Sequence, residues 1–97
     1  MRFIYLDANE MIDRESLHSY IAKQFGIKPY GNSLDMMLMA LIDLKYEYLI
    51  RIKNSDSIES NLGDYGKAFI DVLGVAREIN PMLHIRLLWE TTQLTGL

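Results

Sequence analysis

The sequence predicts an α/β domain in which a three-stranded parallel sheet and its helices form two layers. Two observations lead to this prediction. Segments of strand character and pairs of amphipathic helices follow one another in the order strand, two helices, strand, two helices, strand. Each helical pair is long enough to serve as the crossover that parallel strands require, and such crossovers are right-handed in nearly every case. No linker or repeat divides the 97 residues, so we expect one domain over residues 1–90 and a short tail over residues 91–97.

The first half of the chain predicts one strand and two helices. The segment "RFIYLD" at residues 2–7 is rich in aromatic and β-branched residues without helical spacing, which fits a buried strand. Asp13 is a suitable N-cap for the first helix, and Gly26 supplies its end. After the loop "IKPYGN", a second helix is expected from residue 32 or 33 to about residue 44.

The second half of the chain repeats this order. In "EYLIRIK" at residues 47–53, apolar side chains alternate with a less fully covered face, which indicates a strand. The segment "SDSIESNLG" predicts one or two helical turns that end at Gly63. A longer amphipathic helix is expected from Asp64 to the "NP" pair at residues 80–81, and "LHIRLLW" at residues 83–89 completes the third strand.

Composition excludes several classes of function. The net charge of -3 and the pI near 5.2 argue against a general nucleic-acid binder, because phosphate recognition needs a basic stripe and none appears. The chain has no cysteine, which excludes disulfides and thiol chemistry and is compatible with a reducing cytoplasm. The longest apolar run is far shorter than the roughly 20 residues of a membrane span, and the start "MRFIYLDANE" does not fit a secretory signal. We therefore expect a cytoplasmic protein.

The second predicted helix carries more apolar residues than one buried face uses. A core face is complete with residues at helical spacing, namely Leu34, Met37, Leu38 and Leu41. The opposite side then holds two acids around an apolar centre that Met36 and Ala40 flank, namely Asp35, Met39, Ile42 and Asp43. Two interpretations remain open: a helix covered on both sides, or an exposed apolar patch with a charged rim, which is the usual anatomy of a protein interface.

Candidates for catalysis or metal binding are weak. His18 and His84 are the two histidines, and without cysteines or an acidic constellation they form no ligand set. The segment "GDYGK" at residues 63–67 has the wrong spacing for a phosphate-binding loop. We therefore expect no catalytic residue, no metal and no cofactor, and we predict that the protein is not an enzyme.

Three residue pairs carry a resemblance to a known family. Leu17-His18 on the first helix, Tyr30-Gly31 in the loop and Leu34-Asp35 at the start of the second helix resemble the barstar family of ribonuclease inhibitors. The resemblance implies a two-layer α/β fold with three parallel strands. It also implies a cytoplasmic protein that blocks a secreted bacterial ribonuclease by inserting the second helix and the preceding loop into a basic active site.

The family's contact residues carry over only in part. Tyr30, Gly31 and Asp35 match, whereas Leu38 and Met39 stand where the best-known member has tryptophan and aspartate. The contact surface thus changes from mainly acidic to mainly apolar, which would suit a less basic partner. The residues that we expect to bind the partner are Tyr30, Gly31, Asp35, Leu38, Met39, Ile42 and Asp43.

These expectations define two functions. The first is an immunity protein of a bacterial toxin–antitoxin pair: a stoichiometric inhibitor of a toxin, a ribonuclease, in which Asp35, Asp43 and Glu47 occupy sites meant for phosphate. It would be a monomer when free and would bind neither nucleic acid nor a membrane directly. The alternative is a barstar-like scaffold or regulatory module without nuclease inhibition, which associates with itself through the second helix.

Overall fold

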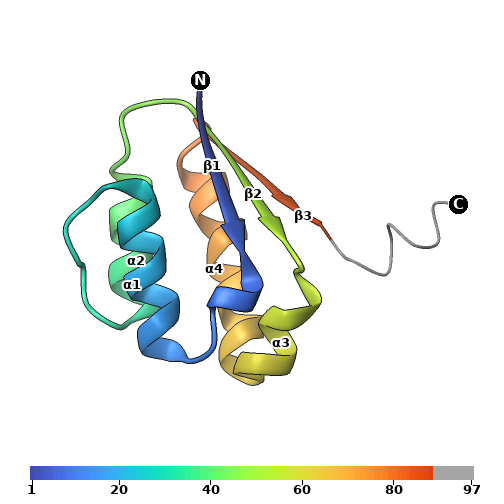
Figure 1. Ribbon diagram of the computed structural model, residues 1–97. Helices are drawn as coiled ribbons and strands as arrows, with labels where there is room; N and C mark the ends of the chain where they lie inside the picture. Colours follow the sequence, from blue (N-terminus) through green and yellow to red (C-terminus); the bar gives the residue numbers. More distant parts are fainter. Residues whose placement is uncertain (89–97) are drawn as a thin grey trace, which may run out of the picture.

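A computed structural model describes residues 1–88 of the chain. A three-stranded parallel sheet in the order β1-β2-β3 lies against helices α1, α2 and α4, which share one side of it (Figure 1). This arrangement confirms the predicted α/β fold class. The elements in chain order are β1 (Arg2–Asp7), η1 (Ala8–Glu10), α1 (Arg14–Phe25), α2 (Leu34–Ile42), β2 (Tyr48–Lys53), α3 (Asp56–Leu62), α4 (Asp64–Ile79) and β3 (Leu83–Leu87).

The central strand β2 has the alternation that its sequence predicts. Tyr48, Ile50 and Ile52 are buried under the helices, whereas Arg51 on the opposite face is exposed. The parallel register pairs Tyr48 with Arg2 on one side and with Leu83 on the other. The third strand ends at Leu87, and Trp89, which the prediction included in it, lies outside the described residues.

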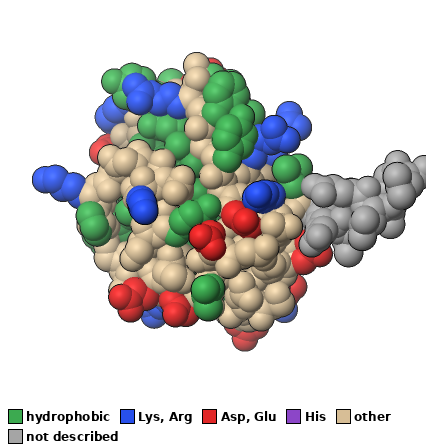
Figure 2. All heavy atoms as spheres, viewed as in Figure 1, with side chains coloured by type: hydrophobic (Ala, Val, Ile, Leu, Met, Phe, Trp, Pro, Cys, Tyr) green, Lys and Arg blue, Asp and Glu red, His purple; other side chains and the backbone are tan. Residues whose placement is uncertain are grey.

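The first strand was expected to be buried, and this prediction is wrong for one of its faces. The side chains of Phe3 and Tyr5 are 55% and 60% exposed, because the helices cover only the opposite face, toward which Leu6 points. The guanidinium carbon of Arg51 lies 5.9 Å from the centre of the Tyr5 ring on this open face. Hydrophobic side chains flanked by basic ones are visible over the upper part of β1 (Figure 2).

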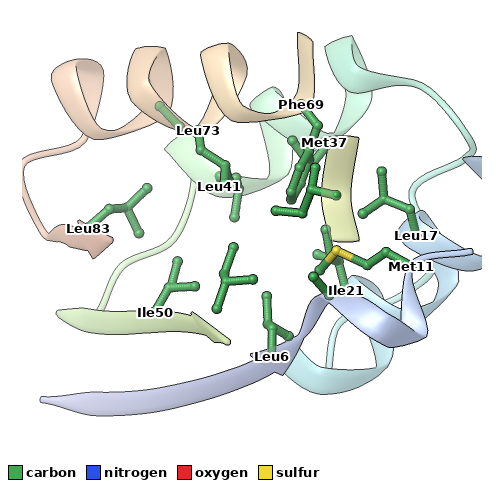
Figure 3. Close-up of a cluster of buried hydrophobic side chains, with 14 of the residues drawn as sticks. Leu6, Met11, Leu17, Ile21, Met37, Leu41, Ile50, Phe69, Leu73 and Leu83 are labelled. Atoms are coloured by element: carbon green, nitrogen blue, oxygen red, sulfur yellow. The ribbon is translucent and has the colours of Figure 1, made fainter. Parts of the chain in front are cut away.

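The core lies between the sheet and the three helices that cover it. Phe69 and Leu73 of α4 meet Met37 and Leu41 of α2 above the buried side chain of Ile50 (Figure 3). These side chains have little or no exposed surface. Burying one such side chain contributes about 1.5 to 3 kcal/mol to the free energy of unfolding. The position of α2 is therefore set by its contacts with the core.

Local signals in the sequence fix the ends of α1. The side chain of Asp13 accepts a hydrogen bond from the backbone N–H of Ser16 at 2.8 Å, and the Ser16 hydroxyl completes a capping box with the Asp13 N–H. Gly26 ends the helix with a positive φ of 68°. Both ends agree with the prediction. They define where the loop that leads to α2 begins.

Candidate partner-binding surface

Helix α2 buries one face and exposes the other. Met37 and Leu41 are fully buried, whereas the side chains of Met36 and Met39 are 46% and 61% exposed. A helix covered on both sides was one of the two interpretations of its sequence, and these exposed methionines contradict it. Leu38 is half-buried and packs against the core, as expected for the face that includes Leu34.

A shallow groove of about 530 Å³ runs along the exposed side of α2. Its lining residues come from the helix and from the loop before it, and they are Tyr30, Met36, Met39, Ala40, Ile42 and Asp43. Four of the seven residues predicted to bind a partner are thus brought together. Ile42 has a double role, because it is half-buried against the core and also lines the groove.

The remaining predicted residues lie around this groove. Asp35 is exposed in the first turn of α2, where the helix dipole favours a carboxylate, and Gly31 is exposed in the loop. Leu38 is not among the lining residues, since its side chain turns toward the core. Met36 and Ala40 line the groove although they were expected only to flank the patch. The two residues are one turn apart, so they lie on the same side of the helix and both reach the groove.

The charges near the groove are acidic. Within α2 the one ionisable residue is Asp35, and Asp43 follows at the C-cap. Asp43 is paired with Lys45 at 3.4 Å, but both side chains are almost fully exposed, so this pair adds little stability. Glu47 was expected to join these acids, but its carboxylate contacts His84 at 3.0 Å at the start of the sheet and does not line the groove.

The N-terminus of α2 is held by its own cap. The hydroxyl of Ser33 accepts a hydrogen bond from the N–H of Met36 at 3.1 Å. The helix was expected to start at residue 32 or 33, which agrees with Ser33 as the cap. Its last residue, Ile42, comes two positions before the predicted end. The cap fixes the direction in which the loop enters the helix.

The C-terminus of α2 is held from another helix. Asn80, at the end of α4, is buried, and its amide nitrogen donates to the carbonyl oxygens of Leu41 at 3.1 Å and Leu44 at 3.2 Å. Its side-chain oxygen accepts from the N–H of Met82 at 3.1 Å. The last carbonyls of a helix have no partner within the helix, and Asn80 satisfies two carbonyls at this end. The sequence alone did not identify this role, because it depends on the contact between α2 and α4.

The loop before α2 contains a backbone conformation that favours glycine. Gly31 has a φ of 104°, which side chains of L-residues rarely adopt. A Cβ atom at this position would meet no atom within 4 Å. Space is therefore not the reason for the glycine. The backbone turn between Tyr30 and the start of α2 is the reason.

His18 joins this loop to two helices. It is 1% exposed on α1, and its Nδ1 lies 2.7 Å from the hydroxyl oxygen of Tyr30, while its Nε2 lies 2.5 Å from that of Tyr65 on α4. Burial, with a smaller effect of the nearby Arg14 cation, lowers the pKa of His18. Burial also raises the pKa values of both tyrosines, so all three groups are neutral near pH 7. The expectation that His18 is structural fits this network, but Tyr65 was not expected in it.

The rest of the described chain contains a larger cavity and no cluster of metal-ligating side chains. Residues 1–88 contain no group of three or more acidic or histidine side chains placed to hold a metal ion. A larger cavity of about 580 Å³ lies at the carboxyl end of β1, between Tyr5, Tyr20 and Arg51 among others. In the same residues, none of the helices has the length and apolar character that crossing a membrane requires.

The chain matches a protein-family model over most of its length. Residues 1–87 match the family model described as Barstar (barnase inhibitor), which spans the elements from β1 to β3. A search of curated proteins finds no match to the chain. The match therefore covers the groove along α2, the loop before it and the His18 network.

Proposed function

Because the chain belongs to the barstar family, we propose that it is an immunity protein that inhibits a bacterial toxin, a ribonuclease, in the cytoplasm. Inhibition is stoichiometric and non-catalytic. Helix α2 and the loop before it cover the active site of the nuclease, and no cofactor takes part. The observation that carries this proposal is the groove that joins Tyr30 to the exposed side of α2.

The groove supplies both parts of a protein interface. Its centre is apolar, with Met36 and Met39 exposed, and a methionine side chain adapts its shape readily to a partner surface. Asp35 and Asp43 lie at opposite ends of the helix, where they face the basic groups that a nuclease uses to bind phosphate. The apolar centre provides affinity, and the two acids attract a basic partner electrostatically before the proteins touch.

The chemistry of the centre indicates a partner less basic than the family's usual one. Met39 replaces the aspartate of the best-known member, and Leu38, in place of a tryptophan, turns toward the core. A partner that fits this chain presents an apolar side chain to the groove and cations at its edges. The replacement of the aspartate by Met39 also disfavours binding to nucleases that are recognised through a charge pair at the centre of the interface.

The test is complex formation with the nuclease encoded by the neighbouring reading frame. The two purified proteins are mixed, and binding and cleavage of total RNA are followed together. Tight one-to-one binding with loss of cleavage supports an inhibitor. Full cleavage at a tenfold excess of this protein contradicts the proposal.

A second function has one specific observation in its favour. The exposed apolar residues of α2 could pair two copies of the chain in a scaffold or regulatory module. Two-fold pairing would bring Asp35 and Asp43 of one copy near those of the other, which disfavours the dimer, so we propose a monomer when free. Sedimentation over a hundredfold range of concentration separates the two functions, since only self-association changes the apparent mass.

A further inference from the structure

The loop from Lys28 to Asn32 is held from outside by side chains. Within the described part of the chain, no backbone-to-backbone hydrogen bond involves these loop residues. The loop is instead tied at two points: the hydroxyl of Tyr30 contacts His18, and the carbonyl oxygen of Asn32 accepts a hydrogen bond from the Nε of Arg14. Both ties come from α1.

We propose that His18, Arg14 and Tyr65 are positioning residues that hold the Tyr30 loop in its binding conformation before the partner arrives. This inference rests on the proposed function, in which Tyr30 contacts the nuclease. It adds three residues that do not line the groove. Their effect on binding acts through the loop.

The ring geometry supports a single fixed arrangement. The His18 ring is nearly perpendicular to both tyrosine rings, at 85° to each, with centroids 5.3 Å from Tyr30 and 5.9 Å from Tyr65. A neutral imidazole has one N–H donor and one acceptor nitrogen. One tyrosine hydroxyl therefore accepts a hydrogen bond from His18, and the other donates one. The two hydrogen bonds together fix the orientation of the His18 ring, and with it the place of the Tyr30 hydroxyl.

Tyr65 connects this arrangement to α4. Its hydroxyl is the partner of the His18 Nε2, and the Arg14 guanidinium carbon lies 5.3 Å from the centre of its ring. Arg14 and His18 are four residues apart on α1 and so project from the same side of the helix. Through Tyr65, α4 therefore contacts both residues of α1 that tie the loop.

Fixing the loop in advance increases affinity. A free loop loses conformational entropy when it is ordered by a partner, and a loop that is already ordered does not. Removing the Tyr65 hydroxyl leaves the His18 Nε2 without its partner and lets the imidazole move. We expect the affinity to fall by about three- to tenfold, the usual effect of one lost hydrogen bond.

The test compares Tyr65→Phe with Tyr20→Phe. Both substitutions remove one half-buried tyrosine hydroxyl, but that of Tyr20 accepts from the N–H of Asp7 at 2.8 Å, away from the loop. Nuclear magnetic resonance on the free protein gives the backbone order parameters of Tyr30, Gly31 and Asn32 and the nitrogen shifts of the His18 ring. Affinity is measured with the neighbouring-frame nuclease.

The expected result is specific to one variant. In Tyr65→Phe the loop order parameters fall from about 0.85 toward 0.6, the His18 nitrogen shifts change, and the affinity decreases. In Tyr20→Phe, stability decreases while all three readouts stay as in the wild type. An unchanged loop in Tyr65→Phe overturns the proposal, and so does a loosened loop with unchanged affinity.

The same data distinguish this inference from the proposed function. If the nuclease does not bind even the wild-type protein, the proposed partner is wrong, while the order parameters still decide whether His18 and Tyr65 fix the loop. Arg14→Gln provides a second variant, because it removes the tie to Asn32 at an exposed position without changing the core. The Asn32 order parameter is expected to fall in this variant, and a rigid Asn32 would contradict the role of Arg14.

Discussion

The side-chain amide of Asn80, at the end of α4, lies 3.1 Å from the carbonyl oxygen of Leu41, in the last turn of α2. The helix that carries the proposed binding surface is therefore closed at its C-terminus by a residue from the other half of the chain. Because α2 is followed by Asp43 in a helical conformation and not by a glycine with positive φ, it lacks the usual C-terminal motif. Asn80 supplies the missing donors.

Asn80→Ala tests this arrangement. We expect a loss of about 2 kcal/mol in the free energy of unfolding, because the buried Asn80 side chain makes three hydrogen bonds. Without it, the carbonyl of Leu44 loses its side-chain donor, and that of Leu41 keeps only the longer hydrogen bond of 3.3 Å from the N–H of Leu44. Urea denaturation measures the change. Asn61→Ala is the matched control, since Asn61 is exposed and donates to the carbonyl of Met11 at 3.3 Å. Equal losses in the two variants would contradict the role assigned to Asn80.

Met39→Asp tests the apolar centre of the groove. We expect nuclease binding to weaken well over tenfold, because the substitution buries a charged carboxylate in an apolar part of the interface. The fold should stay intact, because the side chain of Met39 is exposed in the free protein. Ile12→Asp, at another exposed apolar residue away from the groove, should leave binding unchanged. Ile42→Asp should also lower stability, because Ile42 packs partly on the core. Binding that survives Met39→Asp would place the partner elsewhere.

Gly31→Ala tests the backbone of the loop. At a φ of 104° an alanine is strained, and we expect a loss of about 1 to 2 kcal/mol together with weaker nuclease binding. Gly74 in α4 is the opposite case: a Cβ there meets nothing within 4 Å and the backbone is helical, so Gly74→Ala should stabilise the protein by about 1 kcal/mol. Thermal unfolding measures the expected decrease in stability of Gly31→Ala and the expected increase in stability of Gly74→Ala. A neutral Gly31→Ala would show that the loop adopts another conformation in solution.

The pH dependence of stability tests the burial of His18. Because the pKa of His18 in the folded protein lies below the ordinary histidine value of 6.5, the unfolded chain binds the proton more readily. The contribution of His18 to stability is complete above pH 6.5, and it decreases as the pH falls from 6.5 toward the lowered pKa. The carboxyls of Asp7 and Asp13, whose pKa values are lowered from 3.8, lose their contributions only at lower pH.

Urea denaturation at pH 7.5 and pH 5.5 measures this effect in the wild type and in His18→Gln. The wild type should be less stable at pH 5.5, and the difference should be much smaller in the variant, whose absolute stability is lower at both values. His84→Gln is the control, because His84 is a partly exposed histidine paired with Glu47. A pH dependence that His18→Gln leaves unchanged would contradict the buried neutral histidine.

The dependence of the association rate on ionic strength tests Asp35 and Asp43, the two acids at the ends of α2. Asp35→Asn and Asp43→Asn should each slow association with the nuclease several-fold at low salt and reduce its salt dependence, while dissociation changes little. Stopped-flow mixing at 20 and 300 mM salt gives both rates. Glu10→Gln, in η1 and outside the groove, is the control. Equal salt dependence in all variants would show that these two acids do not belong to the interface.

The order of elements was predictable because it depends on local patterns, whereas the sequence left open whether the second side of α2 is covered or exposed. Alternation in β2 and the caps Asp13 and Gly26 are short-range signals. The spacing of α2 left more apolar residues than its core face needed, and Met39 proves to be exposed. The match of residues 1–87 of the chain to the family model confirms the resemblance first noted on the pairs in α1, the loop and α2.

The features that could not be predicted depend on which elements become neighbours. The exposure of Phe3 on β1 follows from the absence of a helix on that face among residues 1–88, whereas its sequence fits burial equally well. Asn80 and Tyr65 act on α2 and its loop across the contact of α4 with the first half of the chain. Neither residue has a local motif that indicates this role.

The parallel sheet has a consequence for folding kinetics. Each strand pair joins distant segments, such as Arg2 with Tyr48 and Tyr48 with Leu83, so no hairpin can nucleate the sheet. Such non-local pairing slows folding relative to a helical bundle of the same size, because long loops close before their contacts form. If the chain acts as the proposed inhibitor, this slow folding delays the moment after synthesis at which it can bind the nuclease. A cell that makes the nuclease and its inhibitor together is protected if the inhibitor is translated first or in excess.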